Sequence, residues 1–414
     1  MKTLILILFT PTVVLAQVTS IARDPNVQDA LRDIDNANEG IIEEQIRIAE
    51  IPAPPFGEAE RAQYIAERFQ EIGLTDVHRD LEGNVVGAFI GPGTGPLVVL
   101  SAHLDTVFPE GTDVRVKREG TTLIGPGIGD NARGLAVLLV IAKLMKQFQF
   151  PLGGTIHFVA TIGEEGLGNL RGVRYLFDRS PLREKIEYFV AIDGTDIRRV
   201  VHKALGSKRY RVVFRGPGGH SWSDFGIANP IHALGRAINA IAQLEVPVEP
   251  KTSYNVGRVG GGTAVNAVPL EAWIEVDLRS ESNDELQRIA EKVETIIEDA
   301  VNQENALRST SQPEVTADST EVGSRPSGEI PVDNILVRLA TDSAIYLGYE
   351  PKPERSSTDS NYPISIGIPA ITIGGGGTGG STHSVIEWFD ASNSADGVKR
   401  ALLLMLGLLW TSTE

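Results

Sequence analysis

The chain has 414 residues, 42% of them hydrophobic, which is enough for two globular domains with separate cores. Its 54 acidic and 38 basic residues give a formal net charge of −16, which argues against a nucleic-acid partner because phosphates would be repelled. The absence of cysteine excludes disulfides, thiolate metal ligands and a cysteine nucleophile. Any metal must therefore be held by His, Asp and Glu.

The N-terminus has the pattern of a secretory signal peptide. Lys2 precedes an apolar run over residues 4–15, and the small residue Ala16 follows the run. The run is too short to span a bilayer. We therefore expect cleavage between Ala16 and Gln17 and a secreted or periplasmic protein without a membrane anchor. A buried N-terminal strand is the alternative interpretation.

Helix-like and strand-like segments alternate through the first half of the chain. Residues 97–100 and 189–192 are continuously apolar, which is typical of central strands covered on both faces. The alternation predicts an α/β fold with a sheet between helices. The expected helices are 41–50, 58–72 and 132–146, and the expected strands are 84–90, 97–102, 155–161 and 188–192.

The pattern changes near residue 206 and returns near residue 326. The intervening order of strands and helices is βαββαβ, the ferredoxin-like split unit. We therefore divide the chain into a signal peptide (1–16), a catalytic domain in two segments (17–205 and 326–414) and an inserted lid or dimerisation domain (206–325). The expected elements here are strand 209–214, helix 230–244, strands 252–259 and 271–279, helix 283–303, strand 314–322, helix 332–347, strand 370–373 and helix 394–409.

Five short motifs carry six residues that could form one metal site. The motifs are SAHLDT, GPGIGDNARG, TIGEEGLG, AIDGTD and GGSTHSVIE. Several of them follow apolar strands, and ligand sites in α/β sheets cluster at the carboxyl ends of strands. Two imidazoles and three carboxylates can bind two divalent cations, which leaves one carboxylate as a base. The six residues are His103, Asp130, Glu164, Glu165, Asp193 and His383.

Each motif taken alone also has an ordinary structural interpretation. His103 and Asp105 lie two apart, so they could be a ligand and its orienting carboxylate, or a loop histidine with its partner. Asp130 could be the N-cap of the helix that follows, or it could bridge two ions. The adjacent Glu164 and Glu165 could form a solvated turn, or could divide into a ligand and a general base.

With these motifs in this order, the chain resembles the di-zinc exopeptidase and deacylase family that includes peptidase T, carboxypeptidase G, aminoacylase and succinyl-diaminopimelate desuccinylase. The resemblance covers nearly all of the chain after the leader. It implies a three-layer α/β/α, zinc-exopeptidase-like catalytic domain with an inserted ferredoxin-like α+β lid. It also implies two Zn²⁺ per subunit, with Co²⁺ or Mn²⁺ as possible substitutes, and a homodimer formed through the lid.

The resemblance assigns metal ligands at the matching positions. His103, Asp130 and Asp193 would hold one zinc ion. Asp130, Glu165 and His383 would hold the other, with Asp130 bridging the two ions.

Further roles follow from the same resemblance. Glu164 would be the general base, and Asp105 would orient the histidine ligand. His220, in GPGGHSWSDFG, would stabilise the oxyanion from its own subunit or from a partner subunit. Asn266 and Arg279 would contact the substrate, although Arg279 could instead form a salt bridge at a strand end.

The substrate class follows from finer features. In the family, aspartate at the Asp193 position tends to accompany aminopeptidase and dipeptidase activity, and the surroundings of His220 look like peptidase T relatives. We therefore expect an exported metallo-exopeptidase that cleaves short peptides by a metal-bridged hydroxide with Glu164 as base. An N-acyl-amino-acid deacylase or carboxypeptidase, with Arg279 holding the free carboxylate, is the alternative. A catalytically inactive dimeric binding protein is a remote one, since no ligand or base is missing.

Overall fold

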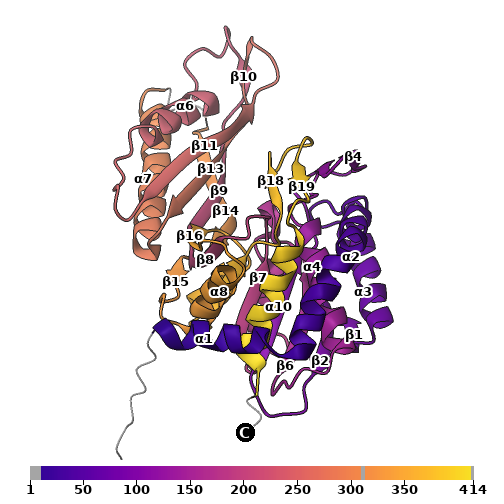
Figure 1. Cartoon of the computed structure of the whole chain (residues 1–414). Coiled ribbons are helices and arrows are strands. Elements are labelled where there is room, and N and C mark those ends of the chain that lie inside the picture. The colour runs from indigo at the N-terminus through magenta and orange to yellow at the C-terminus, as the bar shows by residue number, and fades with distance from the viewer. Residues whose placement is uncertain (1–10, 309–312, 412–414) are drawn as a thin grey trace, which may run out of the picture. The chain divides into compact units, whose positions relative to one another are not determined.

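The computed structural model describes residues 11–308 and 313–411 (Figure 1). The chain divides into two compact units. The first, which we call the large unit, comprises the chain up to residue 204 and from residue 329 onward; the second, the inserted unit, comprises residues 205–328. The sequence patterns place the corresponding boundaries at 206 and 325.

A nine-stranded mixed sheet forms the centre of the large unit. Its order is β1-β2-β6-β3-β7-β17-β8-β15, and β16 pairs with β8. Strands β6, β3, β7 and β17 run parallel, so their carboxyl ends meet at one edge. β3 and β7 are central, as their apolar runs predict. The strands are β1 (Thr75–Arg79), β2 (Val85–Ile90), β3 (Leu97–His103), β6 (Thr155–Thr161), β7 (Ile186–Ile192), β8 (Arg199–Ala204), β15 (Gly328–Glu329), β16 (Lys352–Ser356) and β17 (Ala370–Ile373).

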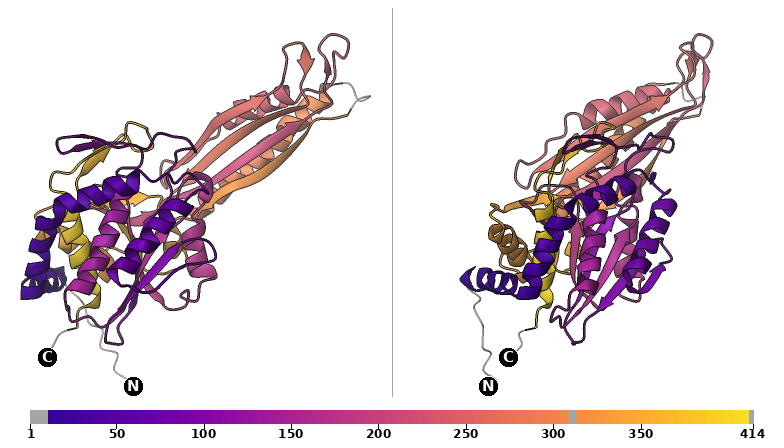
Figure 2. Two further views of the ribbon diagram at one scale, coloured as in Figure 1. Left: turned by 90° about the vertical axis from the view of Figure 1, so that its right-hand side faces the viewer. Right: turned by 45° about the vertical axis from the view of Figure 1, so that its right-hand side comes forward.

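Helices cover both faces of this sheet. On β7, Phe189 packs against Phe177 of α5 (Arg171–Asp178), with ring centroids 5.8 Å apart. Ile192, three residues further along β7, has its side chain on the opposite face, where α4 (Ala132–Gln147) contacts the strand. The layers are therefore α/β/α, as expected, and Figure 2 shows them from two further sides. The remaining helices are α2 (Pro25–Ala49), α3 (Ala59–Ile72), α8 (Ile335–Tyr346), α9 (Asn361–Ser365) and α10 (Ala395–Leu409).

Helix α2 is longer than the sequence pattern predicts. It begins at Pro25, after the N-cap Asp24, whose side chain accepts hydrogen bonds from the backbone N–H groups of Asn26 and Val27. The predicted start at residue 41 is wrong because most side chains in the first turns of α2 are polar. Their few apolar side chains nevertheless lie on one buried face, at helical spacing.

The end of the predicted leader lies in helix α1 (Pro11–Ala22), whereas residues 1–10 lie outside the described residues. Leu15 and Ala16 are exposed. Burial begins after them, where Val18 and Ile21 belong to the core and α1 packs on α8 and α10. Over residues 11–22 the chain is thus a helix and not a strand. Within the described ranges, no helix has the length and apolarity needed to cross a bilayer.

The inserted unit is a four-stranded antiparallel sheet in the order β11-β13-β9-β14 with two helices. The chain order β9, α6, β11, β13, α7, β14 gives the ferredoxin-like arrangement that the sequence predicts. Burial alternates along β13, so one sheet face packs beneath the helices. The elements are β9 (Gly206–Arg215), α6 (Pro230–Ile241), β11 (Thr252–Gly261), β13 (Glu271–Ser280), α7 (Asn283–Ala306) and β14 (Thr316–Arg325).

Candidate metal centre

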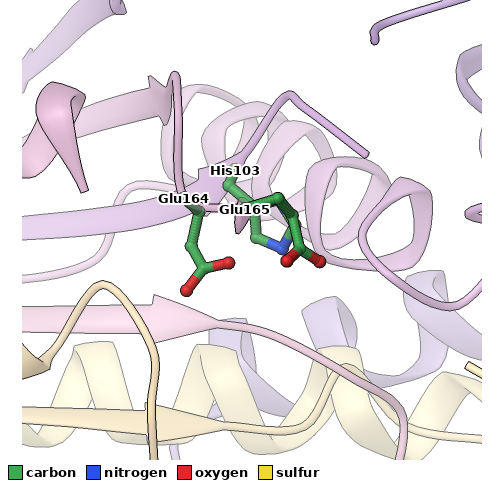
Figure 3. A group of neighbouring side chains, drawn as sticks. All are labelled: His103, Glu164 and Glu165. Atoms are coloured by element: carbon green, nitrogen blue, oxygen red, sulfur yellow. The ribbon is translucent and has the colours of Figure 1, made fainter. Parts of the chain in front are cut away.

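Three parallel strands deliver the first candidate residues to one edge of the large sheet. His103 is the last residue of β3, and it is buried. Glu164 and Glu165 follow the end of β6, and Asp193 follows β7. Figure 3 shows the Glu165 carboxylate beside the His103 ring, while the neighbouring Glu164 side chain extends apart from it.

Asp130 lies between the two candidate histidines. Its Oδ1 is 3.0 Å from Nε2 of His103, and its Oδ2 is 3.2 Å from Nε2 of His383. His383 comes from the far end of the chain, and its segment is held there because β19 (Trp388–Asp390) pairs with β5 (Thr122–Ile124). Each oxygen of one carboxylate thus faces a different imidazole, as a bridging ligand requires.

The other predicted ligands complete two groups around Asp130. Oε1 of Glu165 lies 2.8 Å from Nε2 of His383, and Oδ1 of Asp193 lies 3.9 Å from Nε2 of His103. His103, Asp130 and Asp193 form one group, and Asp130, Glu165 and His383 form another; the ligand atoms in each lie within 4.8 Å of one another. A third group joins His103 to Glu164 and Glu165. The structure brings together all six residues of the predicted metal site.

Asp130 is available as a ligand because it does not cap α4. The N-cap is Asn131, whose Oδ1 accepts a hydrogen bond from the backbone N–H of Gly134 at 3.0 Å. The Asn131 amide also donates to the Ile192 carbonyl on β7 at 2.8 Å, which ties the helix start to the strand before Asp193. The alternative interpretation of Asp130 as the N-cap of this helix is therefore wrong. The Asp130–Asn131 peptide is cis.

Asp105 is fully buried, and its carboxylate lies beside the His103 ring at the distance of an ion pair, not of a hydrogen bond. Nδ1 of His103 donates to the backbone carbonyl of Asp105 at 3.0 Å, while the nearest carboxylate oxygen is 3.7 Å away. The carboxylate instead accepts hydrogen bonds from the backbone N–H groups of Glu164 at 3.0 Å and Glu165 at 2.7 Å. Asp105 thus orients the histidine through its main chain and the glutamate loop through its side chain.

The electrostatics of the cluster suit cations. Burial lowers the pKa of His103, but the carboxylates of Asp105, Asp130 and Asp193 outweigh burial, and the pKa is well above its usual range. Hydrogen bonds to Asp130 and Glu165 raise the pKa of His383 to about 10. The cluster therefore holds protons tightly at sites that divalent ions could occupy instead. Imidazole nitrogens and carboxylate oxygens without thiolates are a ligand set that zinc, cobalt or manganese accepts.

Sequence reasoning missed Glu387, four residues after His383. It is 2% exposed, and its carboxylate accepts hydrogen bonds from backbone N–H groups of the turn that carries Asp130. Burial, followed by the negative charge of Asp130, raises the pKa of Glu387 to about 7. The only hint in the sequence was its position as the acidic last residue of the GGSTHSVIE motif.

The three remaining candidates lie in the inserted unit. His220, in β10 (Gly219–His220), and Asn266, next to β12 (Ala267–Val268), are exposed and adjacent, since the Ser221 N–H donates to the Asn266 carbonyl at 3.0 Å. Arg279 makes an ion pair with Asp277 on the same strand, with Nε 2.8 Å from Oδ2. These residues stay predictions as substrate contacts.

The fold and the paired ligand groups, together with the relatives described below, define a class: metallopeptidases and related zinc-dependent hydrolases that act on amide bonds. The sequence profile of peptidase family M20/M25/M40 matches residues 99–406. The chain belongs to this family.

Two curated relatives illustrate the range of the family. The chain is 25% identical over 359 residues to the uncharacterised protein YqjE of Bacillus subtilis, covering 80% of this chain and 89% of YqjE. It is 26% identical over 260 residues to succinyl-diaminopimelate desuccinylase of Corynebacterium glutamicum, covering 61% of this chain and 69% of that enzyme.

Solved structures share the fold. The aminopeptidase PepT of Bacillus cereus superposes with a TM-score of 0.71 at 20% identity, over 90% of this chain and 98% of that one. The YXEP protein of Bacillus subtilis, described as a dinuclear metal-binding peptidase of the M20 family, has a TM-score of 0.64 at 19% identity, over 90% of this chain and 99% of that one.

Proposed function

We propose that the protein is an exported di-zinc exopeptidase that hydrolyses short peptides, as an aminopeptidase or a dipeptidase. The observation that carries the proposal is the position of Asp130, whose two carboxylate oxygens lie 3.0 Å from His103 and 3.2 Å from His383. The two ligand groups that meet at Asp130 would each hold one ion. When bound, the ions polarise the scissile carbonyl and lower the pKa of water towards neutrality.

Glu164 is the general base in this proposal. Its main chain is fixed by Asp105, and its side chain takes a different direction from that of Glu165 (Figure 3), with a carboxylate oxygen within 4.8 Å of the His103 ring. It removes a proton from the attacking water and delivers the proton to the departing amine. His220 donates a hydrogen bond to the oxyanion of the tetrahedral intermediate.

The substrate class rests on Asp193 and Arg279. Aspartate at position 193 accompanies aminopeptidases and dipeptidases in the resemblance, and the similarity to the aminopeptidase PepT agrees with this. Arg279 already pairs with Asp277, so it is less available to hold a substrate carboxylate. The second candidate is a deacylase of N-acyl amino acids or a carboxypeptidase, which the similarity to succinyl-diaminopimelate desuccinylase favours.

A substrate panel separates the two candidates. Purified protein is assayed with free dipeptides, tripeptides and N-acyl amino acids, each with zinc, cobalt or manganese added back after chelation. We expect cleavage of the peptides with a free amine, and highest activity with zinc. Cleavage of the amino-blocked compounds alone would overturn the peptidase proposal and support the deacylase.

Export is part of the proposal. Leu15 and Ala16 are exposed, whereas the Gln17 side chain donates to the Gly407 carbonyl at 2.9 Å and Val18 is fully buried. Cleavage before Gln17 would therefore leave the packed part of α1 in the mature protein. Mass spectrometry of protein from the periplasm or medium should give Gln17 as the first residue. An intact leader on the active protein would contradict export.

The proposal includes a homodimer formed through the inserted unit. This unit exposes the large apolar side chains of Trp222 and Phe225, each 86% exposed, which a partner subunit would cover in such a dimer. Light scattering should give twice the mass of one chain. Mixing Glu164→Gln with His220→Ala chains tests which subunit supplies His220, because activity returns in mixed dimers only if His220 acts across the interface.

A further inference from the structure

Glu387 binds the backbone of the turn that presents Asp130. Its Oε1 accepts hydrogen bonds from the N–H groups of Gly129 at 2.8 Å and Asp130 at 2.9 Å, and its Oε2 accepts one from Gly127 at 3.1 Å. The Glu387 carbonyl also accepts a hydrogen bond from the Gly125 N–H at 2.9 Å. One residue therefore satisfies four backbone donors in a six-residue segment.

The turn is shaped to receive this carboxylate. Gly127 has φ +71°, a conformation that favours glycine, and a Cβ at Gly129 would lie 3.1 Å from Oε1 of Glu387. The glycines thus let the backbone approach the side chain closely. Without the carboxylate, buried N–H groups would lose their hydrogen-bond partners, which is unfavourable.

Glu387 is not itself placed as a ligand. It belongs to none of the potential ligand groups found among the described residues. It is nevertheless only four residues from His383. A single short segment therefore carries the proposed ligand His383 and also binds the backbone of the proposed ligand Asp130. A buried second carboxylate beside Asp130 is costly by itself, because like charges repel in a low-dielectric site. Three N–H donors, together with cations in the centre, would offset that cost.

We propose that Glu387 is a positioning residue of the metal centre, which holds the Asp130 backbone so that the two carboxylate oxygens face His103 and His383. The inference rests on the metal centre of the proposed function. Because it concerns metal geometry, it is testable without a substrate.

The test compares Glu387→Gln and Glu387→Asp with the wild type and with Glu44→Gln. Glu44 is a matched control, since it is also a buried carboxylate of the large unit, but its partners are Tyr64 and Arg68. Zinc affinity is measured by chelator competition and site geometry by the visible spectrum of the cobalt-substituted protein. We expect zinc binding to weaken about 10–100-fold in Glu387→Gln, with an altered cobalt spectrum, and to be unchanged in Glu44→Gln.

The outcomes separate the hypotheses. Folded Glu387→Gln with wild-type zinc affinity and cobalt spectrum overturns the positioning role. If Glu387→Gln does not fold, Glu387→Asp decides, and failure of both to fold assigns Glu387 a purely structural role. A wild-type protein that binds two ions but cleaves nothing in the panel overturns the proposed function alone. A wild-type protein that binds no divalent ion overturns both.

Discussion

The Asp105 carboxylate accepts a hydrogen bond from the backbone N–H of Glu164 at 3.0 Å. The two residues are 59 apart in the chain, and both are buried. Since the same carboxylate also holds the Glu165 N–H, it fixes the loop on which the proposed ligand and the proposed base sit side by side. Asp105 therefore positions both the proposed base, Glu164, and the proposed ligand, Glu165, through their backbone N–H groups.

Replacement of Asp105 by asparagine should lower kcat/KM. The amide offers one acceptor oxygen to two N–H donors and turns an NH₂ group towards one of them. We expect a loss of about 10–100-fold, with the protein still folded. Asp113→Asn is the control, because Asp113 is an exposed aspartate paired with Arg115. Unchanged kinetics in Asp105→Asn would show that the loop holds its shape without this carboxylate.

The adjacent glutamates should separate by phenotype. Glu164→Gln should keep both metals and lose about 10²–10⁴-fold in kcat, because a general base contributes that much. Glu165→Gln should lose metal, since Glu165 lies 2.8 Å from His383 in a ligand group. Metal content by mass spectrometry and steady-state kinetics distinguish the two. Full activity in Glu164→Gln would remove that residue from its role.

Zinc affinity should fall as pH is lowered. In the metal-free protein the pKa of His383 is raised to about 10, chiefly by Asp130 and Glu165, so the ring carries a proton near neutral pH. An ion must displace this proton, and binding therefore tightens as pH rises towards that value. Proton release on zinc binding is measurable by calorimetry in buffers of different ionisation enthalpy. Zinc binding without proton release would contradict the conclusion that His383 is protonated in the metal-free protein.

The same group makes a prediction for the stability of the metal-free protein. A pKa that is raised on folding adds stability below the unfolded value of about 6.5, and this stability is lost as pH rises through the folded value. For His383 that window ends at about 10. The urea midpoint of metal-free protein should therefore decline between these pH values more than that of metal-free His383→Ala. Equal declines would contradict the prediction.

Asn131→Ala should destabilise the protein more than an ordinary cap deletion. Asn131 caps α4 and also donates to the Ile192 carbonyl, so both interactions are lost. We expect about 2 kcal/mol from urea unfolding. Asn334→Ala is the matched control, since Asn334 caps α8 through the Leu336 N–H, and should cost about 1 kcal/mol. Equal losses would mean that the Ile192 bond contributes nothing.

The sequence alone predicted the layers of the fold and the six residues that the structure brings together at the candidate metal centre. Apolar runs such as β3 and β7 predict central parallel strands, and parallel strands end at one edge, so the residues that follow them converge. Local periodicity predicts the layers, whereas Asp130 and His383 were found from the glycine-flanked motifs and the family resemblance. Periodicity did not reveal the first turns of α2, whose apolar face is sparse.

Only the tertiary structure decided which groups hold those residues in place. Asn131 rather than Asp130 caps α4, and the Asp105 carboxylate accepts hydrogen bonds from the glutamate loop, while the His103 ring bonds the Asp105 carbonyl. Glu387 reaches the Gly129 N–H across 258 residues of chain. Each of these contacts uses a backbone N–H as donor. Every residue except proline offers that group, so the sequence carries no mark of which one a carboxylate will find.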